Sequence, residues 1–320
     1  MDEGRQAPAR PAGGPAAGRG DPGRVSTSAA ATETFLAHRN LLFTVAYEML
    51  GSAADADDVL QETWLRWTAV DTAEVREPRA YLVRITTRQA LNRLRSVKRR
   101  RESYVGSWLP EPLLTTPDVA ADAELADSVS MALMLVLETL SPTERAVFVL
   151  REAFGFGYDE IAAAVDKTPA AVHQIAHRAR RHVEARRPRR SVPPGQAQAA
   201  LAAFQRALED RDIQGLLDVL APDVVAISDG GGIKQANPRP VVGADKVARF
   251  VVGGLARHRV ALTAEPTLVN AAPALALHID GELDGVLAMQ LADDRITGLY
   301  YVRNPQKLTH LDTEAPLTLR

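Results

Sequence analysis

The sequence predicts a multidomain chain in which two all-α modules, the second with a helix-turn-helix, precede an α+β domain. A length of 320 residues exceeds that of a usual single domain. Apolar residues recur at helical spacing up to about residue 187. Beyond residue 197, short Val-, Ile- and Leu-rich runs with turn residues between them replace that spacing. Helices followed by a series of strands are typical of an α+β domain.

Composition and the N-terminal segment exclude several classes of protein. The chain has no cysteine, which excludes disulfides, Cys-ligated zinc and thiol catalysis. No run of 18 apolar residues would span a membrane. Residues 1–31 are rich in Pro, Gly and Ala and lack the apolar stretch of a secretory signal, which predicts a disordered tail. We therefore expect a cytoplasmic protein without membrane contact, cofactor or metal.

The first helical module is predicted over residues 32–103. An apolar stripe predicts a first helix that ends at Gly51. Residues 52–58 supply the cap and first-turn acids of a second helix over residues 59–67. A proline break precedes a third helix, which starts at about Arg79 and runs through a basic block.

The net charge of −2 hides a segregation of charge along the chain. Residues 51–77 carry seven acidic and two basic side chains. Residues 79–104 carry nine basic side chains and one acidic, and residues 167–190 carry eight and one. Two basic blocks far apart in sequence predict two separate contacts with a polyanion, and the segregation favours nucleic acid.

The first basic block places its charges on one face of the third helix. Side chains at spacings of three or four share a helical face. Basic residues there suit a phosphate backbone, and an asparagine among them can read a base edge. The residues on this face are Arg84, Arg88, Asn92, Arg95 and Lys98.

The acidic helix just before this block cannot favour DNA. It is either a capped surface helix or a surface for a protein partner, since acidic and amide residues lie beside exposed aromatics. Asp55, Asp57 and Asp58 also raise the question of a metal. The helix dipole alone explains three acids in a first turn, so we predict no metal site.

A linker over residues 104–121 leads to the second helical module, residues 122–187. Ser141 and Glu144 form a capping box before one helix, and Thr168 caps the last one. This last helix hides small apolar residues and presents polar ones, as a helix in a DNA groove does. The alternative is an ordinary helical hairpin with a solvated basic face. The outward residues are Ala171, His173, Gln174, His177, Arg178 and Arg181.

A second linker over residues 188–196 precedes the C-terminal domain, residues 197–320. The domain starts with an amphipathic helix over residues 197–209. The strands that we predict after it cover residues 224–228, 267–270, 275–279, 285–291 and 296–302.

Three segments of the helical part together resemble regions two and four of extracytoplasmic-function sigma factors of bacterial RNA polymerase. They are ADADDVLQETWLRW, PRAYLVRITTRQALNRLRS and LSPTERAVFVLREAFGFGYDEIAAAVDKTPAAVHQIAHRARR, in that order and spacing. The resemblance covers roughly residues 33–187. It implies a sigma factor that binds promoter DNA and core RNA polymerase, through the β′ clamp and the β flap.

The resemblance also implies roles for particular residues. The third helix and the loop over residues 68–78 would open and read the −10 element, and the outward face of the last helix would read the −35 element. The residues that would dock on the clamp are Asp57, Asp58, Gln61, Glu62 and Leu65.

The C-terminal part resembles the SigJ-like subgroup, which carries a SnoaL-like domain of the NTF2-like fold. The segments are YVGSWLPEPL, SDGGGIKQANPRPVVGADKVARF and YYVRNPQKL. That fold is a curved sheet with helices around an apolar cone, and the subgroup implies that it modulates the sigma modules in cis. The residues implied in this contact are Trp108, Leu109, Pro110, Asp229, Gly230, Gly231, Gly232, Lys234, Asn304, Pro305 and Lys307.

Two departures from the subgroup leave single contacts open. Ile233 stands where the subgroup has lysine, so that Lys234 comes one position late, and Gln306 stands where it has aspartate. A shift of one residue on a strand would turn the lysine to the other face, whereas in a glycine-rich loop it could still reach.

The alternative function is a small-molecule-binding or isomerase- or cyclase-type domain fused to a DNA-binding module. NTF2-like cones also hold enzymes that use a carboxylate base and a hydrogen-bond donor in a dry pocket. A turn cap or a solvent-facing strand end explains the polar candidates better, and we predict no catalytic residue. The candidates are Asp229, His278, Asp280, Tyr300 and Tyr301.

Overall fold

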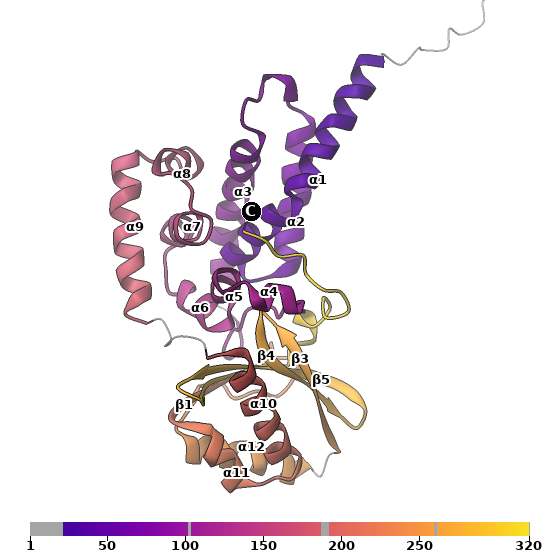
Figure 1. The fold of residues 1–320 in the computed structure, drawn as a ribbon, viewed down its shortest axis with the longest axis vertical. Coiled ribbons are helices and arrows are strands. Elements are labelled where there is room, and N and C mark those ends of the chain that lie inside the picture. The colour runs from indigo at the N-terminus through magenta and orange to yellow at the C-terminus, as the bar shows by residue number, and fades with distance from the viewer. Residues whose placement is uncertain (1–21, 102–103, 187–191, 259–260, 320) are drawn as a thin grey trace, which may run out of the picture.

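The computed structural model describes residues 22–101, 104–186, 192–258 and 261–319. Its elements form three tiers (Figure 1). The helices of the two N-terminal modules form the first tier, a six-stranded sheet forms the second, and three helices lie beneath the sheet. The architecture is the predicted one, because two helical modules precede a domain in which helices cover a curved sheet.

The first module consists of three long helices. They are α1 (Pro22–Leu50), α2 (Ala53–Thr68) and α3 (Pro78–Arg101), with a short 3-10 turn, η1 (Thr72–Glu74), before α3. Ser52 caps α2, since its hydroxyl accepts from the N–H of Asp55 at 3.2 Å. The acidic residues therefore stand at the start of the helix, where the dipole favours them.

The helix α1 begins earlier than the sequence predicted. Residues 22–31 were assigned to the disordered tail, yet they are helical. Alanine is the strongest helix former, and residues 29–32 contain three alanines. Ala31 is buried, and its carbonyl accepts from the indole of Trp67 at 2.8 Å. This contact holds Ala31 against α2, whereas residues 1–21 of the predicted tail lie outside the described residues.

The second module contains the predicted helix-turn-helix. Its elements are α4 (Pro117–Ala121), α5 (Ala123–Val129), α6 (Met131–Leu137), α7 (Pro142–Phe148), a π-helical turn η2 (Val149–Ala153), α8 (Tyr158–Val165) and α9 (Pro169–Glu184). The capping box of Ser141 and Glu144 is present in both directions. Thr168 caps α9 by accepting from the N–H of Ala171. Both predicted helix starts are thus confirmed.

The C-terminal domain alternates helices and strands. Its helices are α10 (Pro194–Glu209), α11 (Ile213–Val219), α12 (Ala244–His258) and the 3-10 turn η3 (Pro305–Lys307). Its strands are β1 (Leu220–Asp229), β2 (Val241–Val242), β3 (Leu262–Val269), β4 (Ala272–Ile279), β5 (Glu282–Ala292) and β6 (Arg295–Val302). The prediction missed β2 and misplaced the strand at residues 267–270, because β3 starts at Leu262 and Asn270 opens the turn between β3 and β4 with a φ of 53°. Asparagine tolerates this left-handed conformation better than most residues.

The strands form one mixed sheet in the order β2-β1-β6-β5-β4-β3, in which β1 and β6 are parallel and the other pairs antiparallel. Side chains alternate between the two faces of this sheet. Leu287 and Tyr301 pair on the face toward α10 and α12, and Ala288 and Tyr300 pair on the face toward the helical modules. The sheet is therefore a wall whose two faces serve different neighbours.

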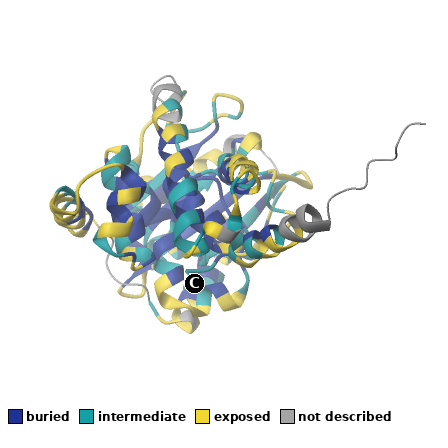
Figure 2. Cartoon of the chain, turned by 90° about the horizontal axis from the view of Figure 1, so that it is seen from above, coloured by how far each residue is buried: buried dark blue, intermediate teal, exposed yellow. Residues whose placement is uncertain are grey.

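Buried apolar residues of the two helical modules form one continuous cluster, so the modules share a core. Viewed from above the helices, buried residues lie at the centre and exposed ones at the rim (Figure 2). The chain end takes part, since Leu317 is 7% exposed within this cluster. The backbone N–H of Thr318 also donates to the hydroxyl of Thr44 in α1 at 3.0 Å.

Candidate nucleic-acid interfaces and the contacts that cover them

The candidate −35 interface is the outer face of α9. Val172, Ala176 and Ala179 are buried and hold the helix against the rest of its module. The helix lies at the outer edge of the molecule (Figure 1). Its polar face is therefore open to a groove of duplex DNA. Of the predicted readers, Ala171 is half-buried, and the exposed ones are His173, Gln174, His177, Arg178 and Arg181.

The candidate −10 interface on α3 is partly engaged within the chain. The Arg88 guanidinium donates to the carbonyl of Ala163 in α8 at 2.9 Å. The Arg84 guanidinium lies 4.8 Å from the centre of the Tyr81 ring. Asn92 and Arg95 are exposed on the same helix, whereas the side chain of Lys98 lies outside the described residues. The structure thus brings the second module onto the face that the sequence assigned to DNA.

A second contact between the modules supports this arrangement. The Arg79 guanidinium lies 4.9 Å from the centre of the Phe156 ring, which belongs to the segment between η2 and α8. A cation over an aromatic face is attracted by the ring quadrupole. In Figure 1, α7 and α8 lie between α3 and α9. The two candidate DNA-binding helices are thereby held in one compact body.

The acidic face of α2 makes ion pairs inside the first module. Asp58 pairs with Arg93 of α3 at 2.6 Å, and Asp57 pairs with Arg39 of α1 at 3.4 Å. Glu62 accepts from the amide of Gln89 at 2.8 Å. These pairs hold α2 against its neighbours, yet Asp58, Gln61, Glu62 and Leu65 remain exposed.

The exposed part of α2 includes apolar surface. Leu65 is 61% exposed, and Leu36 of α1 is 60% exposed. The rings of Phe35 and Trp64, one residue before each, are 5.1 Å apart, so α1 and α2 are in contact here. Apolar side chains beside acidic ones are the composition expected of a surface for a protein partner.

The segment between the two helical modules is buried and does not behave as a free linker. Leu109 is fully buried between the sheet and the helices, and Leu113 is fully buried in the core of the helical modules. The carboxylate of Glu111 accepts from the Ser52 hydroxyl and from the N–H of Ala53, and so adds a second cap to α2. Its carbonyl accepts from the Tyr47 hydroxyl at 2.8 Å. The sequence predicted an interdomain linker over residues 104–121, but it predicted neither this burial nor the helix α4 in the last five of these residues.

Asp229 joins the linker to the C-terminal domain. The carboxylate is fully buried at the end of β1 and accepts from four donors. Two of them belong to the linker, the Tyr104 hydroxyl at 2.7 Å and the N–H of Leu109 at 2.8 Å. The other two are the ammonium of Lys307 at 2.7 Å and the N–H of Gly231 at 3.0 Å.

Lys307 extends the same contact over the aromatic residues of the linker. Its ammonium lies 4.2 Å from the centre of the Trp108 ring and 5.0 Å from that of Tyr104. It also donates to the carbonyl of Leu109. The Lys307 side chain is 12% exposed, and a carboxylate and two aromatic faces compensate its ammonium for the hydration that it has lost. We call the set Tyr104, Trp108, Leu109, Asp229 and Lys307 the linker clamp.

The glycines after Asp229 permit a close approach. Gly231 has a φ of +62°, and a Cβ added there would lie 2.3 Å from the Asn304 side chain. Gly232 has a φ of +73° and lies against Val105 of the linker. Asn304 in turn donates to the Tyr104 hydroxyl at 2.9 Å. Residues with a Cβ would be strained in this left-handed conformation and would push the loop away.

The remaining predicted contact residues divide into two groups. Pro110 is buried within the linker, and Pro305 starts the turn η3 that carries Lys307. Lys234 behaves differently from the expectation that it contacts the sigma modules. Its ammonium pairs with Asp284 of β5 at 3.1 Å, because the loop turns it toward the other face of the sheet.

Sequence reasoning missed Asn270, which joins three parts of the chain. Its fully buried amide donates to the Tyr47 hydroxyl at 2.6 Å and to the carbonyl of Val129 at 2.8 Å. Its side-chain oxygen accepts from the N–H of Leu113 at 3.0 Å. The only signal was an Asn-Ala pair between two apolar runs, which indicates a hairpin turn but no interface.

The catalytic candidates do not gather at one site. Asp229 is occupied by the linker clamp, Asp280 is exposed in a turn, and Tyr300 faces the helical modules. Tyr301 lines a cavity beneath the sheet, where it donates to Asp284. One imidazole nitrogen of His278 is buried without a hydrogen-bond partner in the described structure. The arrangement offers no base and donor pair among these five residues.

Two further observations concern the residues that the structure describes. None of the helices in the described ranges is long and apolar enough to cross a membrane. Within the same ranges, no three His, Asp or Glu side chains gather in a way that could hold a metal ion.

Comparison with known proteins agrees with the arrangement of modules. Residues 34–100 match the Sigma-70 region 2 family, and residues 130–183 match the family Sigma-70, region 4. The ECF RNA polymerase sigma factor SigJ of Mycobacterium tuberculosis is 35% identical over 288 residues, which are 86% of this chain and 92% of that protein. The probable ECF RNA polymerase sigma factor SigI of the same organism is 33% identical over 281 residues, 87% of this chain and 94% of that protein.

A solved structure is similar over nearly the whole chain. The crystal structure of the M. tuberculosis extracytoplasmic function sigma factor SigJ superposes with a TM-score of 0.70 at 30% identity, covering 90% of this chain and all of that one. The similarity includes the sheet domain as well as the helical modules. The chain belongs to the extracytoplasmic-function family of RNA polymerase sigma factors, transcription initiation proteins that bind core RNA polymerase and promoter DNA.

Proposed function

We propose that the C-terminal domain of this sigma factor restrains its own sigma modules through the linker clamp, so that opening the clamp increases binding to polymerase and promoter. The observation that carries the proposal is the fully buried Asp229, which accepts from two linker donors and from Lys307. A charge-assisted hydrogen bond of this kind contributes about 1.5–3 kcal/mol. The linker clamp is thus strong enough to bias the equilibrium between the closed and the open arrangement of the modules.

Contacts outside the clamp support the same restraint. Asn270 ties the sheet to α1 and to α5, and the chain end places Leu317 in the core of the helical modules. All of these contacts connect the C-terminal domain to helices that a sigma factor needs for its function. Because these contacts are buried and join several elements at once, they hold the modules in one orientation.

The contact between the two helical modules explains why a restraint would lower activity. Arg88 of α3 donates to a carbonyl of α8, so the −10 face is partly occupied by the module that reads the −35 element. The −10 and −35 elements lie apart on promoter DNA, so the two modules must separate before each can contact its own element. The restrained arrangement is therefore incompatible with both grips at once.

The proposal assigns the interfaces as follows. The polymerase clamp binds the exposed face of α2, and this contact buries the apolar Leu65 next to the acidic Asp58 and Glu62. The basic face of α3 grips the −10 element, and the outer face of α9 enters the major groove at the −35 element. Of the α9 residues, Arg178 and Arg181 have the side chains best suited to base edges and phosphates.

Run-off transcription with reconstituted core polymerase tests the proposal, on templates selected by the holoenzyme from a genomic fragment pool. Full-length protein, a Lys307→Met variant and a truncation after residue 195 are compared at limiting concentrations. We expect more transcript from the Lys307→Met variant than from the wild-type protein. The truncated protein should also give an amount of transcript that differs from that of the wild type. Equal transcript from all three would refute regulation in cis, and no transcript from any template would refute sigma activity.

A further inference from the structure

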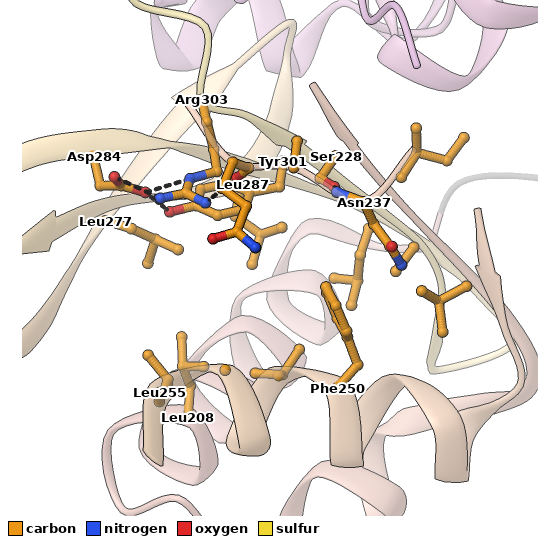
Figure 3. Close-up of a pocket in the computed structure, with 18 of the residues that line it drawn as sticks. Leu208, Ser228, Asn237, Phe250, Leu255, Leu277, Asp284, Leu287, Tyr301 and Arg303 are labelled. Carbon is orange, nitrogen blue, oxygen red and sulfur yellow. Dashed lines mark hydrogen bonds and ion pairs between the residues drawn. The ribbon is translucent and has the colours of Figure 1, made fainter. Parts of the chain in front are cut away.

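A cavity lies between the sheet and the helices of the C-terminal domain, on the side away from the sigma modules (Figure 3). Its volume is about 850 Å³, which falls within the range of small-molecule sites. Leu208 of α10 and Phe250 and Leu255 of α12 form one wall. Leu277 and Leu287 of the sheet lie opposite (Figure 3). The body of any occupant would therefore contact apolar side chains.

One end of the cavity carries a charged cluster. A register shift between β4 and β5 inserts Asp284 as an extra residue, and such a bulge re-aims a side chain. The Asp284 carboxylate accepts from Arg303 at 2.7 and 2.9 Å, from Lys234 at 3.1 Å and from the Tyr301 hydroxyl. The Asp284 and Arg303 side chains meet on the sheet side of the cavity (Figure 3).

Asp284 cannot serve as a proton acceptor for chemistry in this cavity. Burial alone would raise its pKa, but the hydrogen bonds from Arg303 and Tyr301 outweigh burial and lower the pKa to about 2. A useful general base has a pKa near the working pH. Burial and the hydrogen bond to Asp284 raise the pKa of Tyr301, so its hydroxyl stays protonated. The cluster is therefore arranged for binding.

The cluster has positive charge and donors in surplus. Asp284 contributes one negative charge, and Arg303 and Lys234 contribute two positive charges. The Arg303 guanidinium has five N–H groups, of which two bind Asp284 and one binds the carbonyl of Gln235. The Ser228 hydroxyl, also on the cavity wall, accepts from the N–H of Asn237 and keeps its own proton to donate.

We propose that this cavity binds a hydrophobic carboxylic acid in its ionised form. The apolar body lies between α12 and the sheet, and the carboxylate approaches the remaining N–H groups of Arg303. Arginine suits this role because its planar fork matches two carboxylate oxygens. The exposed Arg249 at the rim already pairs with Asp245 at 2.9 Å and does not form part of the anchor.

Isothermal titration of the full-length protein with decanoate, decanol and decylamine, all below their micellar concentrations, tests the proposal. The three probes share one apolar chain and differ in charge. We expect decanoate to bind about ten- to a hundred-fold more tightly than decanol, the range of one charge-assisted hydrogen bond, and decylamine to bind more weakly than decanol. Equal or tighter binding of decanol in the wild-type protein would overturn the carboxylate assignment, and no binding of any probe would overturn the site.

Two arginine variants locate the anchor. Arg303→Met should remove the preference for decanoate while retaining decanol, and the matched variant Arg249→Met should keep the preference. Hydrogen–deuterium exchange of the wild-type protein gives a readout that needs no variant. Decanoate should protect residues 284–303 and α12, and protection confined to other segments would refute the cavity as the site.

Discussion

The replacement Asp229→Asn tests the linker clamp with the smallest change of shape. Each carboxylate oxygen accepts from one linker donor, Oδ1 from the Tyr104 hydroxyl and Oδ2 from the N–H of Leu109. An asparagine has one oxygen, so its NH₂ group faces either Tyr104 and Gly231 or Leu109 and Lys307, and the backbone N–H of that pair loses its acceptor. The closed arrangement then loses at least one hydrogen bond to a charged group, about 1.5–3 kcal/mol.

This loss converts into a measurable change of affinity. Because each 1.4 kcal/mol is a factor of ten, the equilibrium between closed and open forms should shift by about 10- to 100-fold. If only the open form binds core RNA polymerase, the apparent dissociation constant should fall by up to the same factor. Fluorescence anisotropy of labelled protein with core polymerase measures this constant without knowledge of the promoter.

Controls separate release of the clamp from loss of folding. Asp280→Asn makes the same chemical change at an exposed turn of the same domain and should leave the affinity unchanged. Limited proteolysis should cut the Asp229→Asn variant faster within residues 104–113 than the wild type. Faster cleavage there with an unchanged affinity for polymerase would refute the reasoning, because the linker would be free and the restraint absent.

Three further predictions follow from single contacts. Asn270→Asp removes both amide donors and places a carboxylate against the carbonyl of Val129. The free energy of unfolding, measured by thermal unfolding, should therefore decrease by about 2–5 kcal/mol. A decrease below about 0.5 kcal/mol would contradict the role of this residue. Burial raises the pKa of Glu48 from 4.5 to about 8, so the free energy of unfolding should decrease as the pH rises from 4.5 to 8. Glu48→Gln should flatten this pH dependence, as measured by melting curves at several pH values. The same pH dependence in Glu48→Gln and wild type would show that Glu48 is not its source. Gel shifts with holoenzyme and a set of promoters with altered −35 or −10 sequences test the two arginines. Arg178→Ala should reduce the discrimination between −35 sequences by about 1–3 kcal/mol, and Arg88→Ala should reduce the discrimination between −10 sequences. An equal loss of affinity for every promoter would show that neither residue reads sequence.

Local chemistry accounts for the parts of the fold that the sequence predicted well. The capping box at Ser141 and the cap at Thr168 mark helix starts through bonds that span three residues. Strand alternation likewise identified β1 and β3–β6, because a period of two depends on neighbouring residues only. The prediction missed the start of α1, because the buried contact of Ala31 with Trp67 joins residues that are 36 positions apart in the sequence.

The candidate sites divide in the same way. The exposed face of α9 could be predicted, because helical periodicity alone decides which side chains face outward. The engagement of Arg88 by α8 could not, because it depends on how two modules pack. Lys234 also went to Asp284 instead of the sigma modules, since the loop conformation and a bulge decide where both side chains point.

The sequence by itself determined the order of modules, the helix boundaries set by caps and the resemblance to a sigma factor. These properties come from interactions between residues close in the chain or from patterns that neighbours define. Only the tertiary structure decided that the linker is buried, that Asp229 and Asn270 hold it, and that the two DNA-binding helices share one compact body. Such contacts join residues 75 to 157 positions apart, and their geometry exists only after the sheet and the helices have packed together.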